Sequence, residues 1–365
     1  MKVGFISLGC AKNRVDTEIM IAVMKRAGYR ITHRLERADV IIINTCGFIE
    51  AAKEEGINAI IDTGKYKVSQ LQYLIATGCL AQRYGPELLE QMPELDGVVG
   101  ISLFKEIDQA LSKIRKGERP LMIGSPPDVF IEKGPRVLTT PAGSAYLKIT
   151  EGCSNRCAFC AIPSIRGNLR SRPAIELVEE SRGLVEREVR ELVLIGQDTA
   201  VYGHDSGGPG LPYLLEQMAT IEGLEWIRLM YLHPAHIDDE LVDTMARLPK
   251  VLPYMDMPIQ HVSNRMLMKM NRRHTREQLD AVLRKARARI AGLVLRTTVM
   301  VGFPGESTED FQQLLDFVQA TQFDWLGAFA FTAEEGTPAS LMPTQVPEEV
   351  KQERLHAVMT MQAGI

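Results

Sequence analysis

The stretch Gly152-Cys153-Ser154-Asn155-Arg156-Cys157-Ala158-Phe159-Cys160 spaces three cysteines as C-x3-C-x2-C. Three thiolates on one short loop can bind three irons of a cubane iron–sulfur cluster, whereas an electron-transfer cluster usually takes four cysteine ligands. The fourth iron would keep an open position, and open metal positions are where substrates bind. A structural zinc site or a run of buried thiols is the alternative, but no fourth zinc ligand lies nearby, since the next histidine is His204.

This cysteine spacing resembles the signature of the radical S-adenosylmethionine (radical SAM) enzymes. In that family the open iron chelates the amino and carboxylate groups of SAM. One electron from the cluster then breaks the sulfonium C–S bond and gives a 5′-deoxyadenosyl radical. The resemblance therefore implies a 4Fe–4S cluster and SAM as cosubstrate.

Length and composition describe an ordinary globular protein with more than one domain. The chain has 365 residues, of which 45% are hydrophobic and 24% are charged, and its formal net charge is −4. That charge argues against nucleic-acid binding through bulk positive charge. No apolar run reaches the ~18 residues needed to span a bilayer, and residues 1–7 read as a strand rather than a signal peptide. We therefore expect a cytoplasmic protein with no membrane partner.

The first part of the chain alternates short apolar strands with amphipathic helices. Strands are predicted at residues 3–8, 40–43 and 73–76, and helices are predicted after residue 10 and at about 49–61. Strand–helix alternation at this spacing predicts an α/β domain with a doubly wound parallel sheet.

Each of these three strands is followed by a cysteine, namely Cys10, Cys46 and Cys79. Ligands bind at the carboxyl edge of open parallel sheets, so the three thiols should meet at one rim. Each cysteine also adjoins a glycine, which permits close approach of a bulky ligand. The chain has six cysteines, and in a cytosolic protein this number favours metal ligation or catalysis over disulfides. Three unrelated buried cysteines are the alternative.

Residues 124–144 are rich in proline and glycine and are predicted to form a linker. After the linker, strand-like runs alternate with helical stretches at intervals of roughly 30 to 40 residues, the size of a βα unit. Six such units fall short of the eight in a complete TIM barrel, and radical SAM enzymes use a six-stranded partial TIM barrel. The predicted strands are 145–149, 191–195, 226–230, 254–258, 295–301 and 325–331.

Polar or glycine-rich groups follow every strand of this predicted barrel, at the face where functional residues of βα barrels lie. The segment Gly302-Phe303-Pro304-Gly305-Glu306 is expected to offer backbone N–H groups and little bulk to an adenosine. Arg166, Arg170 and Arg172 either pair with a carboxylate of SAM or substrate, or form a structural cluster. The candidate SAM-binding residues are Gln197, Asp198, His233, Gln260, Gly302 and Gly305.

From Met1 to about Ala339 the chain resembles the methylthiotransferases, radical SAM enzymes that insert sulfur into an unactivated C–H bond and methylate it. The resemblance implies two 4Fe–4S clusters. One branch of the family modifies isopentenyl-adenosine in tRNA, and the other modifies an aspartate of the small-subunit ribosomal protein numbered twelve. Local sequence resembles the second branch at Ser7–Asn13, Asn44–Ile49, Gly196–Thr199, Tyr202-Gly203, Asp256–His261 and Glu334–Ala339. The auxiliary cluster would be held by Cys10, Cys46 and Cys79, and the radical-generating cluster by Cys153, Cys157 and Cys160.

The resemblance also implies a reaction with two SAM molecules. One methylates a sulfide on the auxiliary cluster, and the other supplies the radical that removes hydrogen from the aspartate β-carbon before the methylthio group is attached. Both clusters are then expected to share a cavity that excludes water and oxygen. An electron donor such as flavodoxin or ferredoxin is implied. A tRNA methylthiotransferase and a non-catalytic iron–sulfur protein stay open as alternatives.

These observations predict four consecutive segments. They are an N-terminal methylthiotransferase domain at 1–123, the linker at 124–144, the radical SAM partial barrel at 145–340 and a C-terminal helical segment at 341–365. The family carries a small C-terminal β-barrel, the TRAM domain, and we expect it to be missing here. The ribosomal protein would be modified free or in the ribosome, and any nucleic-acid contact would fall to that missing domain.

Overall fold

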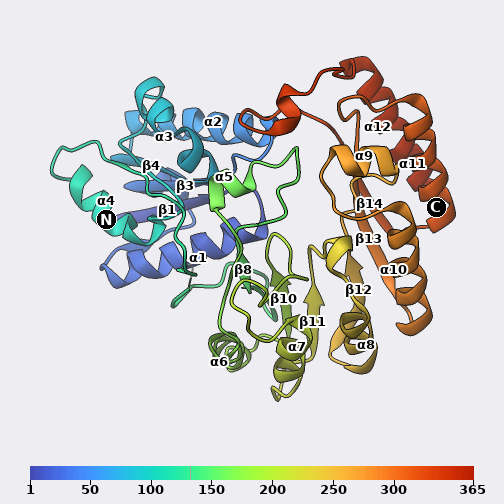
Figure 1. Ribbon diagram of the computed structural model, residues 1–365. Helices are drawn as coiled ribbons and strands as arrows, with labels where there is room; N and C mark the ends of the chain where they lie inside the picture. Colours follow the sequence, from blue (N-terminus) through green and yellow to red (C-terminus); the bar gives the residue numbers. More distant parts are fainter. Residues whose placement is uncertain (132) are drawn as a thin grey trace. The chain divides into compact units, whose positions relative to one another are not determined.

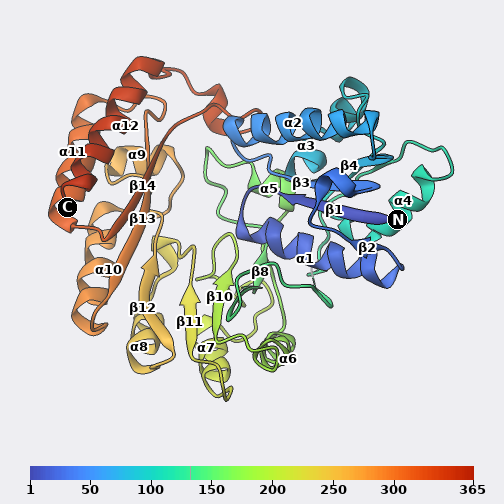
Figure 2. The same ribbon diagram turned by 180° about the vertical axis from the view of Figure 1, so that it is seen from behind.

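The computed structural model describes residues 1–131 and 133–365, so position 132 of the predicted linker lies outside the described residues. The chain divides into two compact units, seen from opposite sides in Figures 1 and 2. The first unit comprises Met1–Thr140 and Ala161–Asn168, and the second comprises Pro141–Cys160 and Leu169–Ile365. The short segment Ala161–Asn168 thus folds with the first unit, although its position after the cysteine loop predicted it within the partial barrel.

The first unit is an α/β fold on a parallel sheet, whose order within the described residues is β2-β1-β3-β4-β5-β6. Its strands are β1 (Lys2–Ser7), β2 (Arg30–Ile31), β3 (Val40–Thr45), β4 (Tyr73–Gly78), β5 (Gly97–Val99) and β6 (Leu121–Met122). Its helices are α1 (Ala11–Arg26), α2 (Glu50–Gly64), α3 (Cys79–Gln91), α4 (Ile107–Ile114) and α5 (Ile162–Arg166). Figure 1 shows α2 and α3 on one face of the sheet and α1 and α4 on the other, the doubly wound arrangement predicted from the sequence.

Strand β3 runs through the centre of this unit and is buried along its whole length. A strand covered by helices on both faces needs apolar side chains at successive positions, and the run Val40–Ile43 supplies them. The strand register aligns Ser7 with Asn44 and Asn44 with Thr77. Strands β1, β3 and β4 therefore end at the same edge of the sheet.

The second unit is built on another parallel sheet, which in the described part of the chain has the order β14-β13-β12-β11-β10-β7. Its strands are β7 (Ser144–Lys148), β10 (Glu191–Ile195), β11 (Trp226–Leu229), β12 (Val251–Asp256), β13 (Val294–Val301) and β14 (Trp325–Ala330), and a small antiparallel pair is formed by β8 (Thr150–Glu151) and β9 (Arg170–Ser171). Its helices are α6 (Ala174–Val185), α7 (Leu211–Ala219), α8 (Asp239–Arg247), α9 (Asn264–Lys269), α10 (Arg276–Arg289), α11 (Thr308–Thr321) and α12 (Glu348–Ala363).

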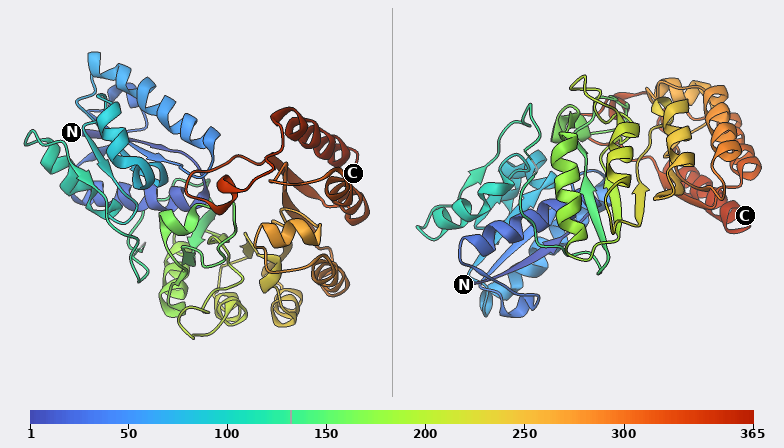
Figure 3. Two further views of the ribbon diagram at one scale, coloured as in Figure 1. Left: turned by 45° about the horizontal axis from the view of Figure 1, so that its top comes forward. Right: turned by 90° about the horizontal axis from the view of Figure 1, so that it is seen from below.

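This second sheet is the partial barrel expected from the sequence, with β7 and β14 as its edge strands among the described residues. Figure 3 shows the longer helices, α6, α7, α8, α10, α11 and α12, around the outside of the strands. Helix α12 packs on β14 and α11 and so belongs to the same unit. Among the helices that the structure describes, none is both long enough and apolar enough to cross a lipid bilayer.

Candidate functional site

The three cysteines of the first unit come together at the carboxyl edge of its sheet. Cys10 immediately precedes α1, Cys46 follows β3, and Cys79 is the first residue of α3. The aligned ends of the three strands fix this convergence, because each cysteine comes two or three residues after the aligned row Ser7, Asn44 and Thr77. We call Cys10, Cys46 and Cys79 the first triplet.

Two glycines make room for this convergence. Gly9 has φ +81, and a Cβ built there would lie 2.8 Å from the Cβ of Cys46 and 3.2 Å from its Sγ. Gly78 has φ +96, and a Cβ there would lie 2.3 Å from Asn44 Oδ1 and 2.4 Å from the Thr45 carbonyl oxygen. A larger residue at position 9 would press on the Cys46 side chain, and one at position 78 would press on the end of β3, so both positions require glycine.

Two buried polar side chains, Arg166 and Asn13, contact the sulfur of Cys79. Arg166 at the end of α5 is 2% exposed and donates from Nε to Cys79 Sγ at 3.3 Å. Its Nη2 donates to Asn13 Oδ1 at 2.7 Å and pairs with Asp16 at 3.3 Å. The amide of Asn13 in turn donates to the carbonyl oxygens of Leu8 and Thr45. The cation is therefore fixed beside Cys79 by two side chains of α1, of which Asn13 is itself bound to Leu8 and to the last residue of β3.

Burial and neighbouring positive charges shift the pKa values of the first-triplet thiols in different directions. Burial raises the pKa of Cys79 to about 11, although the positive charge of Arg166 acts in the opposite direction. Burial likewise raises the pKa of Cys46. Burial acts in the same sense on Cys10, but the charges of Lys12 and Arg166, together with backbone hydrogen bonds, outweigh it and leave the pKa of Cys10 below its usual value.

This donor set fits an iron–sulfur cluster bound by thiolates. A negative charge on Cys10 raises the pKa of both Cys46 and Cys79, so the three sulfurs lie close enough to repel each other as thiolates. A metal cluster deprotonates its coordinating thiols and removes that conflict. The glycine-lined approach and the fixed guanidinium of Arg166 suit an anionic group at the same place.

The second unit carries the C-x3-C-x2-C loop just after β7 and β8, and we call Cys153, Cys157 and Cys160 the second triplet. Backbone bonds hold this loop, since Ala158 donates to the Met270 carbonyl and accepts from the Ala339 N–H. Arg156 takes a left-handed conformation with φ +55, and its carbonyl accepts a 2.7 Å hydrogen bond from Asn271 Nδ2. The loop is thus shaped by the second unit before any ligand binds.

A buried arginine also contacts this second triplet. Arg272 is 5% exposed and donates from Nη1 to Cys157 Sγ at 3.4 Å and from Nη2 to the Pro258 carbonyl at 2.6 Å. Among the described residues it has no carboxylate partner within salt-bridge distance, and its Nε makes no hydrogen bond. An unpaired buried cation is costly. A cluster held by Cys153, Cys157 and Cys160 would supply the missing negative charge.

Asp198, just after β10, fixes the far side of the cysteine loop. Its carboxylate accepts hydrogen bonds from Asn155 Nδ2 at 2.8 Å, His236 Nδ1 at 2.7 Å, Ala200 N at 3.2 Å and His233 N at 3.3 Å. Potential metal-ligand atoms of Asp198, His233 and His236 lie within 4.8 Å of one another. The four donors already occupy the carboxylate, so we interpret the group as a hydrogen-bond centre that ties the cysteine loop to two strands.

Several buried polar atoms at the carboxyl ends of the strands in the second unit lack partners within the part of the chain that the structure describes. They include Gln197 Oε1, His233 Nε2 and Gln260 Oε1. His233 accepts a hydrogen bond at Nδ1 from Ala235 N, so its neutral ring carries the proton on Nε2 and presents a donor. Burial and the neighbouring Arg272 hold the pKa of His233 far below its usual range. Unsatisfied buried groups are rare in folded proteins, and a polar ligand such as SAM would satisfy these.

Gly302 and Gly305 differ from the sequence-based expectation of open N–H groups. The carboxylate of Glu306 accepts from the Gly302 and Phe303 N–H groups, and the Gly305 N–H donates to the Thr344 carbonyl. Both glycines have positive φ. The turn therefore satisfies its own donors, because a carboxylate four residues along reaches back to its start.

The structure also assigns the arginines that the sequence left open. Arg166 lies at the first triplet, whereas Arg172 pairs with Glu176 and Glu180 on α6. Arg170 is buried within β9. Sequence reasoning missed Arg272 because that residue lies 112 positions after Cys160 in a basic run with no cysteine nearby. Asn155 lies inside the cysteine motif itself, so the sequence could have singled it out as a polar side chain that holds the cysteine loop.

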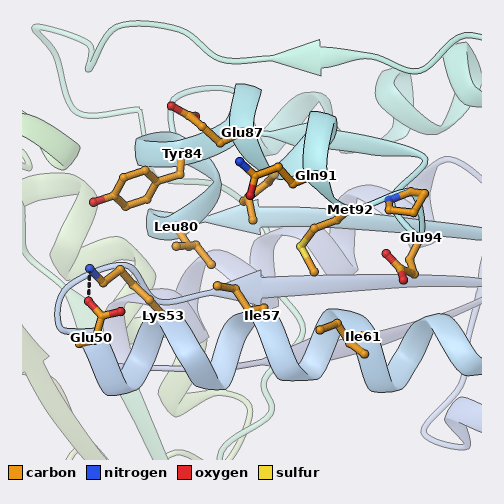
Figure 4. Close-up of a pocket in the computed structure, with 12 residues that line it drawn as sticks. Glu50, Lys53, Ile57, Ile61, Leu80, Tyr84, Glu87, Gln91, Met92 and Glu94 are labelled. Atoms are coloured by element: carbon orange, nitrogen blue, oxygen red, sulfur yellow. Dashed lines mark ion pairs between the residues drawn. The ribbon is translucent and has the colours of Figure 1, made fainter.

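A cavity of about 460 Å³ lies in the first unit between α2 and α3 (Figure 4). Ile57, Ile61 and Leu80 give it an apolar floor, while Lys53 pairs with Glu50 at its edge. No cysteine contributes to its lining. The cavity is therefore separate from the cysteine rim.

Two protein families match this chain. Residues 2–100 match the family described as Uncharacterized protein family UPF0004, and residues 147–318 match the Radical SAM superfamily. The first match covers the first triplet and the second match covers the second triplet.

Close relatives match over the full length of the chain. It is 54% identical to the ribosomal protein uS12 methylthiotransferase RimO of Syntrophomonas wolfei, with the match covering 100% of this chain and 84% of that protein. It is 48% identical to the protein of the same name from Pelotomaculum thermopropionicum, covering 100% of this chain and 83% of that protein.

Solved structures share the fold at low sequence identity. The radical S-adenosylmethionine methyltransferase TsrM from Kitasatospora setae, with cobalamin and a 4Fe–4S cluster bound, matches with a TM-score of 0.68 at 14% identity, over 93% of this chain and 77% of that chain. The cobalamin-dependent radical enzyme OxsB, with aqua-cobalamin and S-adenosylmethionine bound, matches with a TM-score of 0.60 at 11% identity, over 99% of this chain and 56% of that chain.

Proposed function

Because this chain belongs to the RimO family of radical SAM methylthiotransferases, we propose that it methylthiolates the small-subunit ribosomal protein uS12. The observation that carries the proposal is the 54% identity to the Syntrophomonas wolfei protein across the whole chain. The sequence around Cys10 and His261 favours the same branch. We further propose the β-carbon of an aspartate as the position modified.

We propose that each cysteine triplet holds one 4Fe–4S cluster. The second triplet would hold the cluster that cleaves SAM to a 5′-deoxyadenosyl radical, and the first triplet would hold the cluster that carries the methylthio group. Support comes from the three mutually interacting thiols of the first unit and from the buried Arg272 beside Cys157. A flavodoxin or ferredoxin would supply electrons.

The chain's own residues would prepare this site. Asp198 holds the cysteine loop through Asn155 and orients His236, so these three groups position the second triplet. Gln197 and His233 direct unsatisfied buried atoms to the same rim and would bind polar groups of SAM. Gln260 presents a further acceptor there. The N–H groups of Gly302 and Gly305 are already bonded, so these glycines would only leave room for the ligand through their lack of a side chain.

The substrate is tested by competition between two acceptors. The anaerobically reconstituted protein is incubated with SAM, a reductant and sulfide in the presence of both uS12 and tRNA, and both are read by mass spectrometry. We expect one methylthio group on an aspartate of uS12 and none on tRNA. Modification of tRNA alone would refute the proposed substrate and would favour the isopentenyl-adenosine branch.

The division of labour between the triplets is tested with matched variants. Cys10→Ala should still form 5′-deoxyadenosine from SAM but should not methylthiolate uS12, because only the first triplet is damaged. Cys153→Ala should lose both activities. Full methylthiolation by the Cys10→Ala variant would show that the first triplet does not hold the group that is transferred.

A further inference from the structure

Each triplet has one buried arginine whose guanidinium donates to a cysteine sulfur. Arg166 donates to Cys79 at 3.3 Å in the first unit, and Arg272 donates to Cys157 at 3.4 Å in the second. The two arginines come from unrelated elements, the end of α5 and the turn that follows α9. A guanidinium keeps its charge at every pH at which a protein is folded, so each triplet has a permanent positive charge at one ligand.

The first of these contacts is tightly fixed. Arg166 ends α5, and its neighbour Ile165 packs with Ala161 against Cys79 in a small buried cluster. The guanidinium is also bound by Asn13 and Asp16. Because these bonds leave the side chain little freedom to swing away, the contact with the sulfur belongs to the fold.

The second contact has a different charge balance. Arg272 is buried beside Cys157 and the Pro258 carbonyl, and no carboxylate pairs with it among the described residues. Arg166, by contrast, shares its charge with Asp16 at 3.3 Å. A buried charge without a counterion is expensive, so the geometry at Arg272 calls for a permanent anion at the second triplet.

We propose that Arg166 and Arg272 are positioning residues that act through Cys79 and Cys157 to set the reduction potentials of the clusters at the two triplets. The inference rests on the proposed two-cluster function. A cluster bound by cysteine thiolates becomes more negative when it gains an electron, and hydrogen bonds and charges at its sulfurs tune its potential. A fixed cation at a ligand sulfur favours the reduced state and therefore raises the potential.

Each cluster can be measured alone in a chain that lacks the other triplet. In a Cys153/Cys157/Cys160→Ala background only the first triplet remains, and in a Cys10/Cys46/Cys79→Ala background only the second. Redox titration followed by electron paramagnetic resonance gives the midpoint potential in each background without SAM or substrate. Failure of the uS12 assay would therefore leave this measurement unaffected.

We expect Arg166→Gln to lower the potential of the first-triplet cluster so that the ratio of oxidised to reduced protein at fixed potential rises at least tenfold, which is about 59 mV for a one-electron couple. Arg166→Lys should restore most of the potential, because the charge is kept. Arg272→Gln and Arg272→Lys should do the same at the second triplet. Each substitution should leave the potential in the opposite background unchanged.

Asp16→Asn provides a variant of opposite sign that keeps Arg166 in place. Removal of this carboxylate takes one negative charge away from the guanidinium and from the nearby sulfurs, so the potential of the first-triplet cluster should rise. If Arg166→Gln cannot retain iron, an unchanged potential in Asp16→Asn would overturn the proposal for the first triplet. Equal shifts in both backgrounds, or none, would overturn it for both. If no background with the first triplet binds a cluster, the two-cluster function itself fails, while Arg272 is still decided by its own titration.

Discussion

Replacement of Asp198 by asparagine should destabilise the second unit and loosen its cysteine loop. The carboxylate accepts four hydrogen bonds, two from backbone N–H groups and two from the side chains of Asn155 and His236. An asparagine offers one oxygen and places an NH2 group where the other oxygen accepted. Two donors would then face a donor unless Asn155 flips and His236 changes tautomer.

The size of the effect follows from those four bonds. Hydrogen bonds to a charged group contribute about 1.5–3 kcal/mol and neutral ones about 0.5–1.5 kcal/mol, so bonds that survive at the amide oxygen each lose roughly 1 kcal/mol. Adding the cost of reorienting the two side chains, we expect Asp198→Asn to lower the free energy of unfolding of the second unit by about 2–4 kcal/mol.

Intrinsic fluorescence can report this unit selectively, because both tryptophans of the chain, Trp226 and Trp325, belong to it. Urea unfolding of the cluster-free protein, followed by tryptophan emission, gives the change in free energy. Asp238→Asn is the matched control, since Asp238 caps α8 through one bond to Leu241 N at 2.8 Å and asparagine caps helices about as well. A loss for Asp198→Asn no larger than that for the control would refute the role of Asp198 as a hydrogen-bond centre.

Three other predictions concern the first unit. On the proposed two-cluster function, Gly78→Ala should lower the iron content of the reconstituted protein by about half, because a Cβ there meets neighbouring oxygens at 2.3–2.4 Å; iron analysis of the purified protein checks this. In the cluster-free protein, the rate of alkylation by iodoacetamide should reach its plateau at a lower pH for Cys10 than for Cys79. The reason is that the pKa of Cys10 is lowered, whereas burial raises the pKa of Cys79 to about 11. Peptide mass spectrometry measures the alkylation of both residues. Glu18→Gln should destabilise the first unit by about 3 kcal/mol in urea unfolding followed by circular dichroism, because it removes the carboxylate charge that pairs with the buried Arg136.

The sequence predicted the long central strands well because they are buried on both faces and read as continuous apolar runs. The strand at 191–195 was predicted with the bounds that the structure has. Strands β2, β5 and β6 were missed because they are only two or three residues long and carry too little pattern to recognise. Strand β12 begins at Val251 rather than Tyr254, since Pro253 interrupts the pattern at a place where the pairing with β11 is irregular.

The candidate site, too, could be predicted only in part from the sequence. Cysteine spacing and position after strands were enough to group the two triplets, because strand ends in a parallel sheet share one edge. The surroundings of the cysteines depend on contacts between residues far apart in sequence, such as Arg166 with Asn13 and Arg272 with Cys157. The N–H groups of Gly302 could not be assigned because the reach of Glu306 back to them depends on the turn geometry.

The eight residues Ala161–Asn168 have a consequence for how this enzyme can be divided or inherited. They follow the second triplet in the gene but complete the packing around Cys79 in the first unit, through Ala161, Ile165 and Arg166. A fragment ending at Thr140 would contain Cys10, Cys46 and Cys79 but lack the side chains that pack around Cys79, so it would not form the complete surroundings of the first triplet. Recombination between relatives would have to exchange Ala161–Asn168 together with the first 140 residues to keep the surroundings of the first triplet intact.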